Sequence, residues 1–289
     1  MPGGNTTSLA PGLYFVATPI GSARDITLRA LDVLAAADVL AAEDTRNTRR
    51  LMEIHGIALG GRRLIPYHDH NGARQRPKLI AMLEQGLSVA CVSDAGTPLI
   101  ADPGLALARD AIAAGQPVSA VPGASALLAA LTVAGLPSDR FTFAGFLPPK
   151  AAARRKALAE LAQAPGTLVL FETSRRIRGM LADLMPVLGA NRKAALCREL
   201  TKKFEQTRRG TLESLLAGCS DDPPKGEIVL VIGPPEPQVA DDREIDAALA
   251  AVLASGGTMR DAVDAVAGAL GVSRRRVYAR GLERDRSGG

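Results

Sequence analysis

Apolar runs of strand length alternate with helix-like segments along the first half of the chain. The runs occupy residues 13–18, 39–42, 88–93 and 118–121, and each is followed directly by Pro or an acidic residue. Between them, apolar side chains recur every three or four residues, which is the spacing of an amphipathic helix. The alternation predicts an N-terminal α/β domain over residues 13–146, with a largely parallel sheet covered on both faces.

Capping and breaking signals indicate where these helices begin and end. Proline at the first helical position and glycine just after the last one are typical signals. They predict helices around 28–34, from Pro77 to Gly86, from an Asp102 cap through Pro103 to Gly115, and from about Ala124 to Ala134.

The pattern changes around residues 146–150, where the sequence reads FLPPK. Beyond this point, apolar runs at 167–172, 194–200 and 227–233 are separated by fewer helical segments. Because strands outnumber helices there, a mixed sheet is favoured over a parallel one. We therefore expect a second α/β domain over residues 147–233.

Three stretches lie outside these two domains. Residues 1–12 lack the basic and apolar regions of a signal peptide, and we expect a disordered lead-in. Residues 234–242 are rich in Pro and acidic residues, which is typical of a linker. Residues 243–289 are helical in their pattern throughout. The expected fold is thus two α/β domains with a small helical appendage.

The tail has the outline of a helix-turn-helix. Ala262, Val266 and Leu270 share one helical face, Gly271 ends that helix, and Ser273 is placed to cap the next one. A small bundle with a solvated basic face is the alternative interpretation. The second helix is rich in arginine, and its candidates for phosphate contacts are Arg274, Arg275, Arg276 and Arg280.

Composition narrows the functional classes. The net charge of +5 and the pI near 9.4 favour an anionic partner such as nucleic acid, or else a generally basic surface. The low aromatic content of 3%, without any Trp, argues against a stacking platform for single-stranded bases. Cys91, Cys197 and Cys219 are widely spaced, which predicts neither disulfides nor a metal site. No apolar run reaches the ~20 residues of a membrane span. We expect a cytoplasmic protein with no membrane contact.

Three loops at predicted strand ends carry candidate chemistry: TPIG at 18–21, SDAGTP at 93–98 and VPGAS at 121–125. Open α/β sheets bind ligands at the carboxyl ends of their strands. Gly96 would let a ligand approach the backbone, and negative charge at Asp94 and a nearby Asp102 would suit a cationic ligand. Neither a dinucleotide fingerprint nor a P-loop occurs.

Several longer stretches resemble one protein family. They are TPIGSARDITLRAL at 18–31, AAEDTRNT at 41–48, HDHN at 68–71, SDAGTPLIADPG at 93–104, AGLPSDRFTFAGFLP at 134–148, FETSRR at 171–176, RELTKKFE at 198–205 and KGEIVLVI at 225–232. On these stretches the chain resembles the tetrapyrrole-methylase-type (class III) S-adenosylmethionine methyltransferases. Through AEDTRNT, HDHN and RELTK it resembles more narrowly the bacterial members that 2′-O-methylate a cytidine in the decoding region of 16S rRNA.

The resemblance implies that S-adenosylmethionine lies in a cleft between the two domains. It also implies which residues contact this cofactor, mainly at the three strand-end loops and at the second-domain strands. The expected contacts are Pro19, Gly21, Asp94, Ala95, Gly96, Thr97, Ile100, Ser125 and Ala126 from the first domain, with Glu172 and Ala195 from the second.

Methyl transfer to a ribose hydroxyl benefits from a base that removes or orients the hydroxyl proton. The leading candidates are Glu43, Asp44 and Lys202, and further ones are Asp94, His68 and His70. To act as a base, Lys202 would need a depressed pKa, and burial beside Arg198 could provide it. Glu43 and Asp44 have an alternative role as ion-pair partners of Arg46 or Arg49. The resemblance implies no metal.

Basic and polar residues in the matching stretches are candidate RNA contacts. They are Arg46, His68, His70, Asn71, Arg175, Arg176, Arg198 and Lys203, with Arg274, Arg275 and Arg276 in the tail. A solvated charged surface is the alternative for the arginines and lysines. The expected partner is 16S rRNA or the small ribosomal subunit, and the family resemblance implies a homodimer. The competing functions are a tetrapyrrole (precorrin or uroporphyrinogen) methyltransferase and a non-enzymatic nucleic-acid-binding protein.

Overall fold

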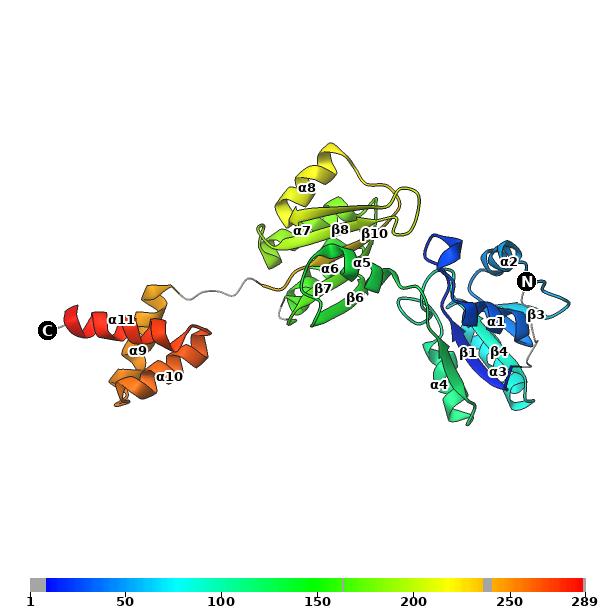
Figure 1. The fold of residues 1–289 in the computed structure, drawn as a ribbon, viewed down its shortest axis with the longest axis horizontal. Coiled ribbons are helices and arrows are strands. Elements are labelled where there is room, and N and C mark those ends of the chain that lie inside the picture. Colours follow the sequence, from blue (N-terminus) through cyan, green and yellow to red (C-terminus); the bar gives the residue numbers. More distant parts are fainter. Residues whose placement is uncertain (1–8, 163, 236–240, 288–289) are drawn as a thin grey trace. The chain divides into compact units, whose positions relative to one another are not determined.

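The computed structural model describes residues 9–162, 164–235 and 241–287, and most of the expected lead-in therefore lies outside the described residues. Its first sheet has five parallel strands in the order β3-β2-β4-β1-β5 (Figure 1). The strands are β1 (Gly12–Val16), β2 (Val39–Ala42), β3 (Arg63–Pro66), β4 (Ser88–Val92) and β5 (Val118–Val121). The predicted parallel sheet is confirmed.

Helices cover both faces of this sheet. On one face, α1 (Leu28–Ala36) and α2 (Thr45–Ile54) pack against the core around Leu40 and Ala90. On the other, α3 (Gly72–Glu84) and α4 (Leu105–Ala113) pack around Leu13 and Val89. The helices that follow the neighbouring strands β1 and β4 thus lie on opposite faces. The carboxyl ends of β1 and β4 therefore form a topological switch point, which is where sheets of this kind bind ligands.

Two of the helix starts predicted from proline are wrong. α3 begins at Gly72, and Pro77 lies inside it. The chain turns into this helix through the Asn71 side chain, which accepts a hydrogen bond from the His68 amide (3.0 Å) and donates one to the Pro66 carbonyl (3.0 Å). The cap of α4 is Gly104 at φ 136°, not Asp102. This leaves the Asp102 carboxyl available for other contacts.

The second sheet is mixed, as predicted, with the order β6-β7-β10-β8-β9. β6 and β7 are parallel, and the other neighbours are antiparallel. The strands are β6 (Phe141–Phe146), β7 (Thr167–Thr173), β8 (Lys193–Arg198), β9 (Gln206–Thr211) and β10 (Glu227–Ile232). One face is covered by α6 (Ala151–Leu161), α7 (Ile177–Leu188) and α8 (Leu212–Asp221), and the other by α5 (Ala126–Ala134).

The FLPPK stretch at 146–150 does not separate the two sheets. It begins at Phe146, the last residue of β6, and β6 pairs with β7 and therefore belongs to the second sheet. α5 also packs on that sheet, through contacts of Leu127 and Leu131 with Val169 and Val229. The chain passes from one sheet to the other between β5 and α5, at the VPGAS loop. Pro148 and Pro149 mark the end of a strand, and in a sequence such a strand end is easily taken for a domain boundary.

The tail forms a compact unit of its own from Pro235 onward. Residues 236–240 of the expected linker lie outside the described residues. Capping boxes start α9 (Asp242–Ala254) at Asp241 and α10 (Met259–Leu270) at Thr258. Gly271 ends α10 in the left-handed conformation, and the Ser273 side chain accepts from the Arg276 amide at the start of α11 (Arg274–Ser287). The predicted helix–turn–helix outline is confirmed.

Candidate active site

The strand-end loops at the switch point are tied to one another by hydrogen bonds. Thr18 and Gly96 exchange backbone bonds of 2.9 and 3.0 Å, and the Ser93 hydroxyl donates to the Gly96 carbonyl (3.0 Å). The Thr97 hydroxyl donates to the Ala124 carbonyl (3.0 Å) and so joins the SDAGTP and VPGAS loops. The Gly96 amide and Thr97 hydroxyl, expected as ligand contacts, are thus engaged within the protein. They hold the loops in place.

A cavity of about 320 Å³ opens beside these loops and is lined by both sheets. Five of the expected cofactor contacts line it: Asp94, Ala95, Ile100, Ala126 and Glu172. Sequence reasoning did not assign the other main lining residues to the cofactor site, which are Ile20, Glu43, Ala101, Asp102, Phe146, Phe171, Thr173, Cys197, Glu199, Leu200, Glu227, Ile228 and Val229. The matching stretches FLP, FETSRR, RELTK and KGEIVLVI contained most of these residues, but not which of them face the cavity.

Six expected cofactor contacts lie outside the lining, and for Ala195 and Ser125 the reason is side-chain direction and packing. Ala195 is fully buried beneath α5, whereas Cys197, two residues along on the same face of β8, reaches the cavity. Ser125 occupies the cap position of α5 and is partly buried. A strand residue's face follows from the pleat, but its depth along the face depends on the helix that covers it.

Gly21 and Pro19 line a neighbouring cavity of about 340 Å³ between the TPIG loop and α2. Gly21 also contacts the second domain, because a Cβ there would lie 2.5 Å from the Lys202 Cγ and 2.9 Å from the Leu200 carbonyl oxygen. Next to it, the Ser22 amide donates to the Thr201 hydroxyl (3.0 Å). The glycine therefore allows the RELTK turn to dock on the first loop.

Unfavourable backbone conformations are found in the two loops that border the cavity. Leu99 and Ala101 have φ of 72° and 63° in the loop after β4, and Glu199 and Thr201 have φ of 49° and 63° in the turn after β8. Residues other than glycine rarely adopt such φ angles, and each residue that does costs of order 1–3 kcal/mol of folding free energy. The surrounding contacts must compensate for this cost, which is a common feature of binding sites.

The cavity wall is strongly acidic. Its carboxylates are Glu43, Asp94, Asp102, Glu172, Glu199 and Glu227. Burial, followed by the charges of Glu43 and Asp94, raises the pKa of Asp102 to about 7. Burial likewise raises the pKa of Glu43. A cationic ligand would relieve this repulsion, whereas a phosphate would increase it.

Glu172 is the most deeply buried of these carboxylates, with a side chain that is 0% exposed. Its Oε1 accepts from the Thr173 amide (2.8 Å) and lies 3.2 Å from the Arg176 Nε. Its Oε2 is buried without a hydrogen-bond partner in the part of the chain that the structure describes. Because an unsatisfied buried carboxylate oxygen is costly, Oε2 is suited to accept from a ligand in the cavity.

Comparison with known proteins agrees with this arrangement of two sheets around a cavity. The tetrapyrrole (corrin/porphyrin) methylase family matches residues 12–216. The chain belongs to this family. Residues 239–285, which include α9, α10 and most of α11, match a second family described as the RsmI C-terminal HTH domain.

Relatives cover almost the whole chain. The ribosomal RNA small subunit methyltransferase I of Mesorhizobium japonicum is 49% identical over 282 residues, which are 97% of this chain and 95% of that protein. The crystal structure of a uroporphyrin-III C-methyltransferase from Thermus thermophilus is similar with a TM-score of 0.54 and 26% identity, over 77% of this chain and 94% of that one. A second structure of such a Thermus enzyme, complexed with S-adenyl homocysteine, has the same fold (TM-score 0.54, 20% identity, 77% and 97% coverage).

The structure separates the base candidates of this methylase. Asp44 caps α2 by accepting from the Arg46 amide, and its hydrogen bonds with the Arg46 side chain hold its pKa at about 2. Burial favours the neutral form of Lys202, but hydrogen bonds to Glu227 and Glu199 outweigh this and raise its pKa. The depressed pKa considered for Lys202 is therefore wrong, and neither residue lines the cavity. Glu43 does line it.

The histidine candidates lie in the loop after β3. The His68 Nε2 lies 3.1 Å from the Asn71 amide, and its Nδ1 is buried without a partner among the described residues. His70 is exposed and meets the His68 ring edge-on. Within the described residues, no group of three or more His, Cys, Asp or Glu side chains is placed to hold a metal ion.

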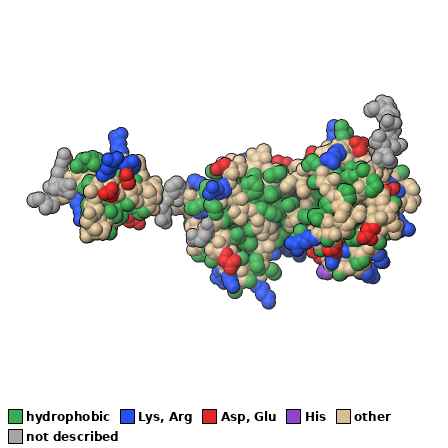
Figure 2. Space-filling view, turned by 90° about the horizontal axis from the view of Figure 1, so that it is seen from below, with side chains coloured by type: hydrophobic (Ala, Val, Ile, Leu, Met, Phe, Trp, Pro, Cys, Tyr) green, Lys and Arg blue, Asp and Glu red, His purple; other side chains and the backbone are tan. Residues whose placement is uncertain are grey.

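The candidate RNA contacts fall into two groups. Arg46, Arg175 and Lys203 are exposed. Arg176 instead donates to the Leu147 carbonyl (2.7 Å) and pairs with Glu172, and the Nε of Arg198 is buried. On the face shown in Figure 2, Lys and Arg side chains lie at several separate places.

No described helix is long and apolar enough to cross a membrane.

In the tail, Arg274 pairs with Asp264, Arg276 with Asp242 (2.8 Å), and Arg280 with Asp246. Arg275 has no hydrogen-bond or ion-pair partner among the described residues. It lines a hollow of about 560 Å³ together with Arg260 and the half-exposed Tyr278. Arg260 and Arg275, neither of which has an ion-pair partner among the described residues, therefore place uncompensated positive charge at this hollow.

Proposed function

We propose that the chain transfers a methyl group from S-adenosylmethionine to the ribose 2′-oxygen of a cytidine in the decoding region of small-subunit ribosomal RNA. The observation that carries the proposal is the acidic, two-sheet cavity at the switch point of a methylase fold. The 49% identity with a ribosomal RNA small subunit methyltransferase over 97% of the chain supports RNA as the substrate.

The cavity residues fit S-adenosylmethionine. The volume of about 320 Å³ is within the range of sites that enclose small ligands. Ile100, Phe146 and Phe171 offer apolar surface for an adenine, and Glu172 Oε2 offers an acceptor for an amine or hydroxyl. The surrounding carboxylates suit the positive sulfonium and ammonium groups. When bound, the cofactor supplies an electrophilic methyl group.

The chain's own residues contribute alignment and charge. Methyl transfer needs the attacking oxygen, the methyl carbon and the sulfur nearly in line, so rigid positioning is a main source of rate. The hydrogen bonds among Thr18, Gly96 and Thr97 provide that rigidity at the sheet edge. The cavity's acidic wall keeps RNA phosphates outside, so that a sugar edge and not the backbone approaches the cofactor.

The remaining proposals rest on the substrate and, for the dimer, on the family resemblance. We propose that the small ribosomal subunit is the form in which the RNA is met, that the protein acts as a homodimer, and that it works in the cytoplasm where ribosomes assemble. The exposed Arg46, Arg175 and Lys203 and the tail hollow at Arg275 would contact phosphates away from the cavity.

Labelled S-adenosylmethionine incubated with purified small subunits, with their naked RNA and with a porphyrinogen tests the function. We expect label in the RNA, at a 2′-O-methylated cytidine that resists alkaline hydrolysis. Label in the porphyrinogen but not in RNA would assign the chain to the tetrapyrrole enzymes that share its fold. Nucleic-acid binding without any cofactor binding would make it a non-enzymatic protein. A sedimentation measurement tests the dimer.

A further inference from the structure

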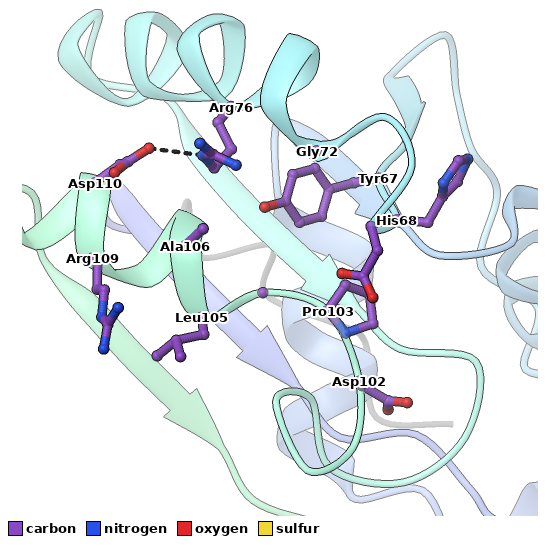
Figure 3. A pocket seen from close by; sticks show the side chains of 12 residues that line it. Tyr67, His68, Gly72, Arg76, Asp102, Pro103, Leu105, Ala106, Arg109 and Asp110 are labelled. Carbon is purple, nitrogen blue, oxygen red and sulfur yellow. Dashed lines mark hydrogen bonds and ion pairs between the residues drawn. The ribbon is translucent and has the colours of Figure 1, made fainter. Parts of the chain in front are cut away.

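A second cavity adjoins the cofactor cavity on the first domain. Its volume is about 470 Å³, and it lies between the loop after β3, the start of α3 and the start of α4 (Figure 3). Among the described residues, Asp102 alone lines both cavities. Figure 3 shows Asp102 at one end of the second cavity and the paired Arg76 and Asp110 at the other.

This second cavity has the chemistry to hold a nucleotide. Arg109 lines it without a hydrogen-bond or ion-pair partner among the described residues, and Arg76 is held by Asp110 at 2.8 Å. Cations in a concave site attract and position a phosphate. The exposed Leu105 and the Pro103 ring offer apolar surface, and the carboxylate of Asp69 offers an acceptor for an exocyclic amine such as that of cytosine.

Asp102 has no hydrogen-bond or ion-pair partner among the described residues, although it is half-buried. The charged groups around it are Glu43 at the end of β2, Asp69 after β3 and Asp94 after β4, all of them acidic. The thiol of Cys91 on β4 is also close, and burial, with the charges of Glu43 and Asp102, raises its pKa to about 12. The lone pairs of Asp102 are therefore free to accept a substrate proton.

We propose that this second cavity holds the target nucleotide, unstacked from its RNA, and that Asp102 accepts the proton of the attacking 2′-hydroxyl. The inference rests on the proposed function. The attacking oxygen and the methyl group must meet at the junction of substrate and cofactor sites, and Asp102 stands at that junction. A bond forms between the ribose oxygen and the methyl carbon, while the carbon–sulfur bond breaks and leaves its electron pair on sulfur. The proton passes to Asp102 and then to water.

The cavity at Pro19 and α2 is the alternative place for the nucleotide, because it shares Asp94 with the cofactor cavity. Asp94 is less suited to accept a proton, since its Oδ1 already accepts from the Asp44 amide (2.9 Å). Each of the two cavities carries an arginine without an ion-pair partner among the described residues, Arg50 in one and Arg109 in the other, since Arg76 is paired with Asp110, so the free carboxylate of Asp102 decides between them. The second cavity is therefore favoured.

The first test compares the full-length Asp102→Asn variant with the wild type on small subunits. We expect kcat to fall by ~100-fold or more, the scale of lost general-base catalysis, while calorimetry still detects S-adenosylmethionine binding. The wild-type kcat/KM for S-adenosylmethionine, which reports the free enzyme, should rise with pH up to about 7 and then level, because the Asp102 carboxyl must be ionised, and this rise should be absent in Asp102→Asn. Asp102→Glu, which keeps the carboxylate, should recover part of kcat and the pH dependence. Asp32→Asn, an exposed carboxylate on α1, is the matched control.

The second test separates the two candidate cavities. Arg109→Ala should raise the KM for small subunits by about 10-fold with a small change in kcat, and by more than Arg50→Ala does. The reverse order would place the nucleotide beside α2 and overturn the proposal. So would an Asp102→Asn variant that binds cofactor and retains wild-type kcat and pH dependence. A wild-type protein that methylates no RNA would instead overturn the proposed function, which the same assay reports first.

Discussion

Thr18 and Gly96 exchange two backbone hydrogen bonds, of 2.9 and 3.0 Å, although they lie at the ends of different strands. This bridge joins the loops after β1 and β4 at the point where their following helices diverge to opposite faces. Gly96 adopts φ 85°, so the bridge depends on a residue that tolerates the left-handed region. It sets the positions of Asp94 and Ala95 in the cavity wall.

Replacing Gly96 with Ala should destabilise the protein and weaken cofactor binding together. A Cβ there would be 3.4 Å from Ile20 Cγ2, so backbone strain and not a clash accounts for the cost of about 1–2 kcal/mol. Gly86→Ala is the matched control, because Gly86 has φ 81°, nothing within 4 Å of its Cβ and no place in the cavity wall. Denaturant unfolding should report similar losses for both. Equal S-adenosylmethionine affinities in calorimetry would contradict the role given to the bridge.

Gly21→Ala should separate the first loop from the RELTK turn. The new Cβ would lie within 2.9 Å of three atoms of Leu200, Thr201 and Lys202, and such overpacking costs about 1–3 kcal/mol. We expect lower cofactor affinity as well, because Leu200 lines the cavity. Gly268→Ala in α10, where the Cβ meets nothing within 4 Å, should leave that affinity unaltered. A Gly21→Ala protein with wild-type affinity would show that loop docking is not needed for binding.

Glu172→Gln should lower S-adenosylmethionine affinity by ~10-fold or more, since a hydrogen bond to a charged group is worth about 1.5–3 kcal/mol. Glutamine keeps the shape of the side chain but removes its charge. Isothermal titration of the variant measures the loss, with the exposed Glu160→Gln on α6 as the control. If both variants bind as tightly as the wild type, the buried Oε2 does not contact the cofactor.

The raised pKa of Asp102 has a consequence for stability. Above its folded pKa of about 7 the carboxyl is charged in both states, and burial among other carboxylates then disfavours the folded state. As the pH falls from about 7 towards 3.8, the folded protein binds this proton first and the penalty disappears. Asp102→Asn should therefore raise Tm at pH 8, with a gain that shrinks toward acid pH. Thermal melts that show a constant difference would contradict the raised pKa.

In the tail, Arg275→Ala and Arg276→Ala should act differently. Arg275 is unpaired at the tail hollow, so its loss should weaken RNA binding and lower the slope of log affinity against log salt by about 1. Arg276 pairs with Asp242, so its loss should affect the melting of the tail more than the salt dependence. Filter binding at several salt concentrations measures both. Identical slopes for the two variants would argue against an RNA contact at Arg275.

Local signals in the sequence were enough to predict the fold class and the edge of the sheet at which the candidate cavity lies. Short apolar runs, each followed by Pro or an acidic residue, predicted parallel strands with functional loops at their ends, because strand period and chain reversal depend on neighbouring residues. Gly271 and Ser273 predicted the tail turn for the same reason. The helix starts at Pro77 and Asp102 failed because Asn71 and Gly104, each in its own turn, determine where α3 and α4 begin.

Which side chains meet in the cavity was decided only by the tertiary structure. Ala195 and Cys197 share a strand face and are both buried against α5, yet of the two only Cys197 reaches the cavity. Lys202 is held by Glu199 and by Glu227 from another strand, which raises its pKa where sequence reasoning considered a lowered one. Asp102 lies at the junction of two cavities, and the ends of β2, β3 and β4 bring Glu43, Asp69 and Asp94 around it. Such contacts join residues far apart in the chain, and the physical reason they escape sequence reasoning is that no local pattern encodes the distance between them.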